Sequence, residues 1–129
     1  IGAAGDDKIA SATRADYAAA AARVISEAGH EGKVYELAGD SAWTLTRLAA
    51  ELTKQSGKQV TYQNLSEADF AAALKSVGLP DGLADMLADS DVGASKGGLF
   101  DNSKTLSKLI GRPTTTLAES VSHLFNVNN

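Results

Sequence analysis

Apolar residues recur at helical spacing in several stretches of the chain, and polar or glycine-rich turns separate these stretches. The first stretch follows Thr13, an N-cap candidate with Asp16 three positions later, which resembles a capping box. We expect Gly29 to end this helix. Its expected apolar face consists of Tyr17, Ala21, Val24, Ile25 and Ala28.

The same spacing predicts further helices along the rest of the chain. They are expected to follow Thr44, Ser66, Pro80, Asp101 and Thr116. Glycines at 57 and 111 are expected to end two of them. On the helix after Pro80, which should reach about Asp91, the residues expected to be buried are Leu83, Met86 and Leu87. Residues 93–98 are expected to form a flexible loop or lid.

Short β-prone stretches occupy residues 8–10, 33–38 and 59–63. Because strands and helices then alternate, the pattern favours a helix-rich α/β fold with parallel pairing. We expect a single domain over residues 1–129, with strand–helix units in 1–65 and a helical lobe in 66–129. At 129 residues and 43% hydrophobic content, the chain is long enough for one core.

Composition narrows the possible partners and environment. The net charge of −4 makes nucleic acid a poor partner, and the absence of cysteine excludes disulfides and thiolate chemistry. No transmembrane-length apolar run or signal peptide is visible, so we expect a cytoplasmic protein without membrane insertion. The chain starts at Ile1, which suggests a processed product or an excised piece of something longer.

Most motifs that could carry chemistry are incomplete. His30 and His123 lack metal-ligand partners at helical spacing, so we expect both on the solvated surface and predict no metal site. Residues 93–98 lack the Lys-Ser/Thr pair of a phosphate-binding loop. Ser120 has no orienting acid for nucleophilic catalysis, and no tyrosine is followed by lysine four positions later. We therefore predict no catalytic residue in this chain.

Arg14 is the exception, because it stands where a helix start exposes free backbone N–H groups. A guanidinium at that point can bind a phosphate or carboxylate through several donors. The alternative from the pattern alone is a surface arginine that pairs with Asp16 or stacks on Tyr17.

Three stretches together point to a known family: residues 11–25, the strand–loop–helix over 34–52, and the tail 101–125. They resemble the C-terminal half of an NAD(P)H:quinone oxidoreductase of the NmrA-like, atypical short-chain dehydrogenase family. The resemblance implies the C-terminal portion of a Rossmann-type protein whose N-terminal dinucleotide-binding half is missing. It implies hydride transfer from NADPH or NADH to a quinone, without a general acid or base in this region.

The resemblance also indicates which residues lie beside the cofactor. They are Ala12, Thr13, Arg14, Ala15, Asp16 and Tyr17. Two other interpretations stay open, namely an NADP-sensing regulatory module without catalysis and an inactive helical packing fragment. The particular quinone, the preference between NADPH and NADH, and the oligomeric state are not encoded in a recognisable way.

Overall fold

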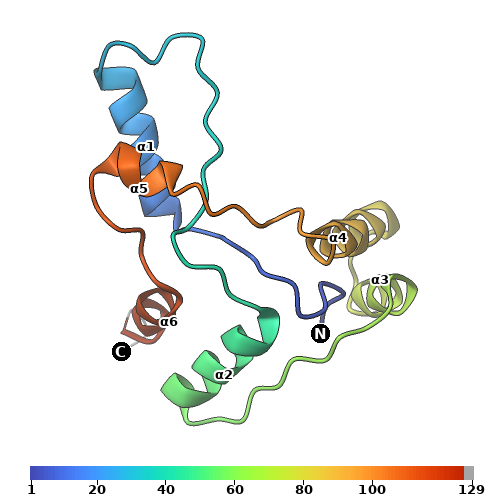
Figure 1. Ribbon diagram of the computed structural model, residues 1–129. Helices are drawn as coiled ribbons and strands as arrows, with labels where there is room; N and C mark the ends of the chain where they lie inside the picture. Colours follow the sequence, from blue (N-terminus) through green and yellow to red (C-terminus); the bar gives the residue numbers. More distant parts are fainter. Residues whose placement is uncertain (127–129) are drawn as a thin grey trace. The chain divides into compact units, whose positions relative to one another are not determined.

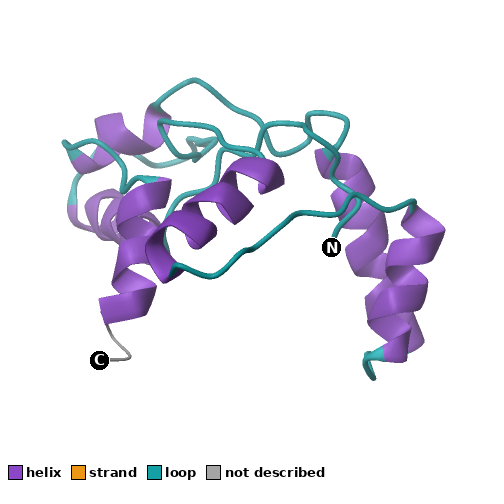
Figure 2. Ribbon diagram, turned by 90° about the horizontal axis from the view of Figure 1, so that it is seen from below, coloured by secondary structure: helices purple, strands orange, loops and turns teal. Residues whose placement is uncertain are grey.

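A computed structural model describes residues 1–126 of the chain. The part described is built from helices joined by extended connections, as Figures 1 and 2 show. The helices are α1 (Arg14–Ser26), α2 (Leu45–Ser56), α3 (Glu67–Ser76), α4 (Asp81–Ala94), α5 (Thr105–Ile110) and α6 (Leu117–Asn126). The helix-rich character predicted from the sequence is therefore confirmed.

The predicted strands at 8–10, 33–38 and 59–63 are not formed within residues 1–126. Only isolated bridges occur in this part, one of them between Ile9 and Trp43. A strand requires a neighbouring backbone in register, and the extended segment 33–38 has no such ladder partner in the described residues. The β-prone side chain of Val34 is 89% exposed there.

Helix starts follow the capping residues predicted from sequence. The Thr13 hydroxyl accepts a hydrogen bond from Asp16 N at 3.1 Å, and the Ser66 hydroxyl accepts one from Asp69 N at 3.2 Å. These bonds satisfy N–H groups that have no acceptor inside the helix. The predicted stop at Gly57 is also confirmed, since its φ of 69° is the left-handed conformation that favours glycine.

The apolar face predicted for the first helix is not the face that is buried. Asp16 and Ala20 are the buried residues of α1, whereas Ile25 is 86% exposed. A carboxylate occupies the interior because polar partners reach it there, and this turns the expected apolar face towards solvent. The helix also ends at Ser26 with Glu27 as its C-cap, so Gly29 lies in the following turn.

Later boundaries and faces also differ from expectation. On α4 the small residues Ala84 and Ala88 are buried, while Leu83 and Met86 are exposed, because small side chains allow α3 and α4 to pack closely. This helix continues to Ala94, so the predicted loop 93–98 is shorter than expected. Helix α5 begins at Thr105 and not at Asp101, whose carboxylate instead holds a local turn at Ser103.

The chain divides into two compact units, each made of two separate stretches. This grouping does not follow the expected division at residue 65. The first unit contains residues 1–9 and 43–99. Its core lies at the pair α3 and α4, which run side by side in both views, and consists of Ala3, Phe70, Ala71 and Ala88.

The second unit contains residues 10–42 and the described part from 100 onwards. Helices α1 and α5 pack together around Ala20, Leu106 and Ile110. The backbone of Gly39 lies against the segment before α1, with Gly39 N donating to Ala10 O at 2.8 Å. A Cβ at Gly39 would lie 2.3 Å from Ser11 O, so this close approach requires glycine.

Candidate functional site

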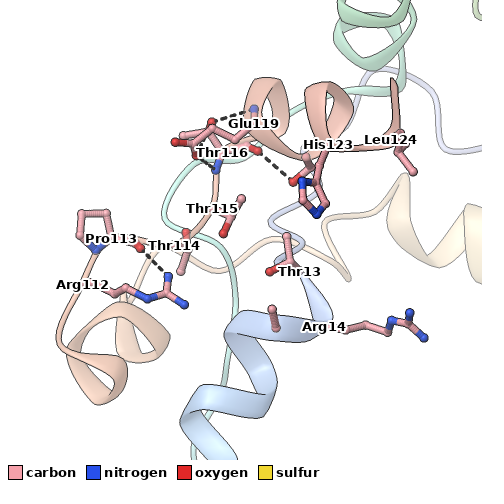
Figure 3. A pocket seen from close by; sticks show the side chains of 12 residues that line it. Thr13, Arg14, Arg112, Pro113, Thr114, Thr115, Thr116, Glu119, His123 and Leu124 are labelled. Atoms are coloured by element: carbon pink, nitrogen blue, oxygen red, sulfur yellow. Dashed lines mark hydrogen bonds between the residues drawn. The ribbon is translucent and has the colours of Figure 1, made fainter. Parts of the chain in front are cut away.

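A pocket of about 940 Å³ lies within the second unit. Three parts of the chain line it: residues 13–15 at the start of α1, the loop 112–116 between α5 and α6, and one side of α6. The lining residues from α6 are Glu119, Ser120, His123 and Leu124. In Figure 3 the His123 ring points from α6 towards Thr13. The pocket therefore combines several hydrogen-bonding groups with a lining that is mostly apolar.

The start of α1 presents donors to this pocket. As the first two residues of the helix, Arg14 and Ala15 have backbone N–H groups with no intrahelical acceptor, and no other hydrogen bond from them occurs within residues 1–126. The exposed Arg14 side chain extends from the same turn and forms no ion pair in this described part. The helix N-terminus adds positive potential, so this corner of the pocket favours an anionic group.

The opposite wall is the loop 112–116, and Asp16 holds it from inside. Thr115 N donates to Asp16 Oδ2 at 2.8 Å, and Arg112 Nη1 lies 2.7 Å from Asp16 Oδ1. The second contact is an ion pair, and Arg112 Nη1 also donates to the Pro113 carbonyl. Asp16 is completely buried, so these contacts replace its hydration.

The pKa of Asp16 reflects this environment. Burial alone would raise the pKa of the carboxyl, but the hydrogen bond from Thr115 N and the nearby Arg112 guanidinium outweigh burial and lower the pKa below its ordinary value of 3.8. Asp16 is therefore ionised at neutral pH and its charge is neutralised internally. Arg112 carries out that neutralisation, which leaves Arg14 available to a ligand.

A second carboxylate, Asp40, holds the same loop. Thr114 N donates to Asp40 Oδ2 at 3.0 Å, while Asp40 N donates to the Thr114 hydroxyl at 2.8 Å. The Ser107 hydroxyl of α5 donates to Asp40 Oδ1 at 2.6 Å. Since Thr114 is only 6% exposed, this reciprocal pair is shielded from water and fixes the centre of the loop.

The residues expected beside the cofactor are thus divided in space. Thr13, Arg14 and Ala15 line the pocket, whereas Ala12 and Tyr17 do not. Asp16 lies beneath the pocket wall and pairs with Arg112, so the alternative in which Arg14 pairs with Asp16 is not what the structure shows. Whether these six positions contact a cofactor stays a prediction.

Sequence reasoning missed the other half of the site. The sequence pattern predicts the loop 112–116 only as the end of one helix and the cap of the next. Its anchors lie far away in sequence: Thr115 is 99 positions from Asp16, and Thr114 is 74 from Asp40. The pattern of a single sequence carries no signal that pairs such positions.

The two histidines differ from each other. His123 is exposed, as expected, and it also lines the pocket. His30 is not a freely solvated residue, because its Nδ1 lies 2.8 Å from the Tyr35 hydroxyl and its side chain is 16% exposed. Over residues 1–126 no group of three or more His, Asp or Glu side chains is placed to hold a metal ion. None of the helices described is long and apolar enough to cross a membrane.

Comparison with known proteins defines the class to which this architecture corresponds. No protein-family model matches the chain. Three curated proteins match it, and all three have the names of oxidoreductases. The resemblance to a quinone oxidoreductase stated from the sequence is confirmed, because one of these proteins is a quinone oxidoreductase that is similar to the chain over its whole length.

Among these proteins, quinone oxidoreductase 2 of Escherichia coli K12 is 97% identical over the whole chain. An NAD(P)H azoreductase of Xenophilus azovorans is 30% identical over 115 residues, which are 89% of this chain. The chain covers 45% of the first protein and 40% of the second. It therefore spans about half the length, or less, of the curated relatives that it matches.

Solved structures give the same result. The crystal structure of the E. coli NADPH-dependent quinone oxidoreductase in complex with NADPH matches with a TM-score of 0.94 and 97% identity, over 97% of this chain and 44% of that one. The NADP(H) complex of Citrobacter sp. triphenylmethane reductase matches with a TM-score of 0.89 and 38% identity, over 95% of this chain and 43% of that one. Both relatives are thus nicotinamide nucleotide-binding reductases.

Proposed function

We propose that this chain forms the substrate-side portion of an NADPH-dependent quinone oxidoreductase, and that the start of α1 lies beside the cofactor. The observation that carries the proposal is the 97% identity, over the whole chain, with quinone oxidoreductase 2 of E. coli. The structural match to the NADPH complex of that relative supports the same assignment.

The chemistry of the pocket fits part of a nicotinamide nucleotide. Phosphate groups need cationic or N–H donors, and the start of α1 offers the Arg14 guanidinium together with the amides of Arg14 and Ala15. The Thr13 hydroxyl is already used in capping and contributes to the shape of the pocket. These donors cannot enclose a whole dinucleotide, so the remainder of the binding site must come from other chain segments.

When bound, the nicotinamide supplies the hydride, so the protein needs to position two rings. In this proposal Arg14 and the first turn of α1 bind an anionic group of the cofactor, and the loop 112–116 and α6 form a wall that limits access of water. Asp16 acts indirectly, through Thr115 and Arg112, because it is completely buried. The partly exposed segment 33–38 has no ladder partner in the described residues and is available to pair with strands outside this chain.

Steady-state kinetics of the complete protein test this assignment. The chain is placed in full-length quinone oxidoreductase 2 in exchange for the segment that it matches, and NADPH oxidation is followed with a benzoquinone as acceptor. We expect quinone-dependent turnover. Binding of NADPH without turnover would support the sensor interpretation instead, and absence of both would contradict the proposal.

The replacement Arg14→Ala in that protein tests the cofactor contact. We expect the KM for NADPH to rise about tenfold, which corresponds to the loss of about 1.4 kcal/mol from one charge-assisted contact, with little change in kcat. Arg47→Ala is the matched control, since Arg47 is an exposed arginine in the first turn of α2 and does not line the pocket. An equal change of KM in both variants, or no change in Arg14→Ala, would show that Arg14 is a surface residue without a cofactor contact.

A further inference from the structure

Three consecutive backbone amides of the pocket loop each donate to a different carboxylate. Thr114 N donates to Asp40, Thr115 N to Asp16 and Thr116 N to Glu119, at 3.0, 2.8 and 2.7 Å. Bonds from N–H to an ionised carboxylate are stronger than bonds between neutral groups. The loop is therefore held by its main chain at three adjacent points.

The three carboxylates belong to three separate parts of the second unit. Asp16 lies in α1, Asp40 in the extended connection before α2, and Glu119 in α6. Glu119 is a local contact, because it forms a capping box in which its own N–H donates to the Thr116 hydroxyl. Asp16 and Asp40 instead join the loop to distant elements, so they determine where the loop stands relative to the start of α1.

All five residues of the loop 112–116 line the pocket, whereas neither Asp16 nor Asp40 does. The two carboxylates therefore contact the loop on the side that faces away from the pocket. Asp40 is fixed in turn by the Ser107 hydroxyl of α5 and by its own N–H bond to the Thr114 hydroxyl. This arrangement leaves the loop little freedom to move away from Arg14.

We infer that Asp16 and Asp40 are positioning residues, which set the pocket wall opposite Arg14 through the amides of Thr114 and Thr115. The inference rests on the proposed function for the identity of the ligand, NADPH. A carboxamide at position 40 is uncharged and can accept from Thr114 N through only one oxygen, because its other side-chain atom is a donor. The replacement Asp40→Asn therefore removes the charge from this contact with the loop without a change in side-chain size.

The test uses full-length quinone oxidoreductase 2 that carries this chain, with kinetics and amide NMR spectra of each variant. For Asp40→Asn and Asp16→Asn we expect the KM for NADPH to rise about fivefold and kcat to stay within about twofold. The amide signals of Thr114 and Thr115 should shift in the same variants. Ser66→Ala is the control, because it removes the N-cap of α3 in the other unit and lowers stability without touching the pocket.

A second pair of variants keeps the test decisive if Asp40→Asn does not fold. Thr114→Val removes only the hydroxyl that accepts from Asp40 N, and Thr114→Ser keeps it. We expect a raised KM in the first variant and a KM near the unsubstituted value in the second. An unchanged KM in Thr114→Val and Asp16→Asn, or an equal rise in Ser66→Ala, would overturn the positioning role. Lack of turnover before any replacement would instead refute the proposed function.

Discussion

Removal of the buried carboxylate of Asp16 should lower the free energy of unfolding by an amount that follows from its two contacts. In Asp16→Ala the Thr115 amide loses its acceptor, and an unpaired amide at a shielded position costs about 1–3 kcal/mol. Arg112 loses its partner as well, but its side chain is 48% exposed, so it returns to water and the loss is at most about 1 kcal/mol. We expect the free energy of unfolding to fall by about 1–4 kcal/mol.

Urea denaturation followed by far-ultraviolet circular dichroism measures this loss. The control is Asp85→Ala, which removes an ion pair of similar length, 2.8 Å to Lys75, between partly and largely exposed side chains. That replacement should cost at most about 1 kcal/mol. An equal loss of unfolding free energy in the two variants would show that burial does not strengthen the contacts of Asp16.

Three further predictions concern acid stability and backbone constraints. The pKa values of Asp16 and Glu119 are lowered, so each carboxylate stabilises the folded chain fully above its unfolded-state pKa, near 4, and loses this contribution as the pH falls through the lower folded-state value. The acid unfolding curve of Asp16→Asn should therefore be shallower than that of the unsubstituted chain. A curve of equal slope would contradict this prediction. Gly39→Ala should be strongly destabilising in thermal denaturation because the new methyl group would overlap Ser11 O, and a melting temperature unchanged from that of the parent would refute the close approach. Gly82→Ala, on α4 with open space around it, should instead raise stability by about 0.5–1 kcal/mol, and a loss would show a contact that the structure does not contain.

The helix caps, which depend only on residues close in sequence, could be predicted from the sequence. The caps at Thr13 and Ser66 were correct because a hydroxyl and the N–H three residues later meet whenever a helix starts there. The family resemblance was correct for a different reason, since it used long stretches of residues and not one motif.

Features that depend on distant partners were not predictable. The burial of Asp16 in place of Ile25 depends on Thr115 and Arg112, about a hundred residues further along the chain. In the same way, the alanine face of α4 is buried because α3 packs closely against it, and hydrophobic periodicity alone favoured Leu83 and Met86. The expected strand 33–38 had the right residue types, but a ladder also needs a neighbouring backbone.

We propose that this chain completes a quinone oxidoreductase whose remaining part binds most of the cofactor. Reconstitution from two pieces is the decisive experiment. This chain is coexpressed with the part of E. coli quinone oxidoreductase 2 outside the matched segment, and quinone-dependent NADPH oxidation is measured for each piece and for the pair. We predict turnover by the pair and none by either piece. A pair that associates as folded protein but oxidises no NADPH, or turnover by one piece without the other, would contradict the claim.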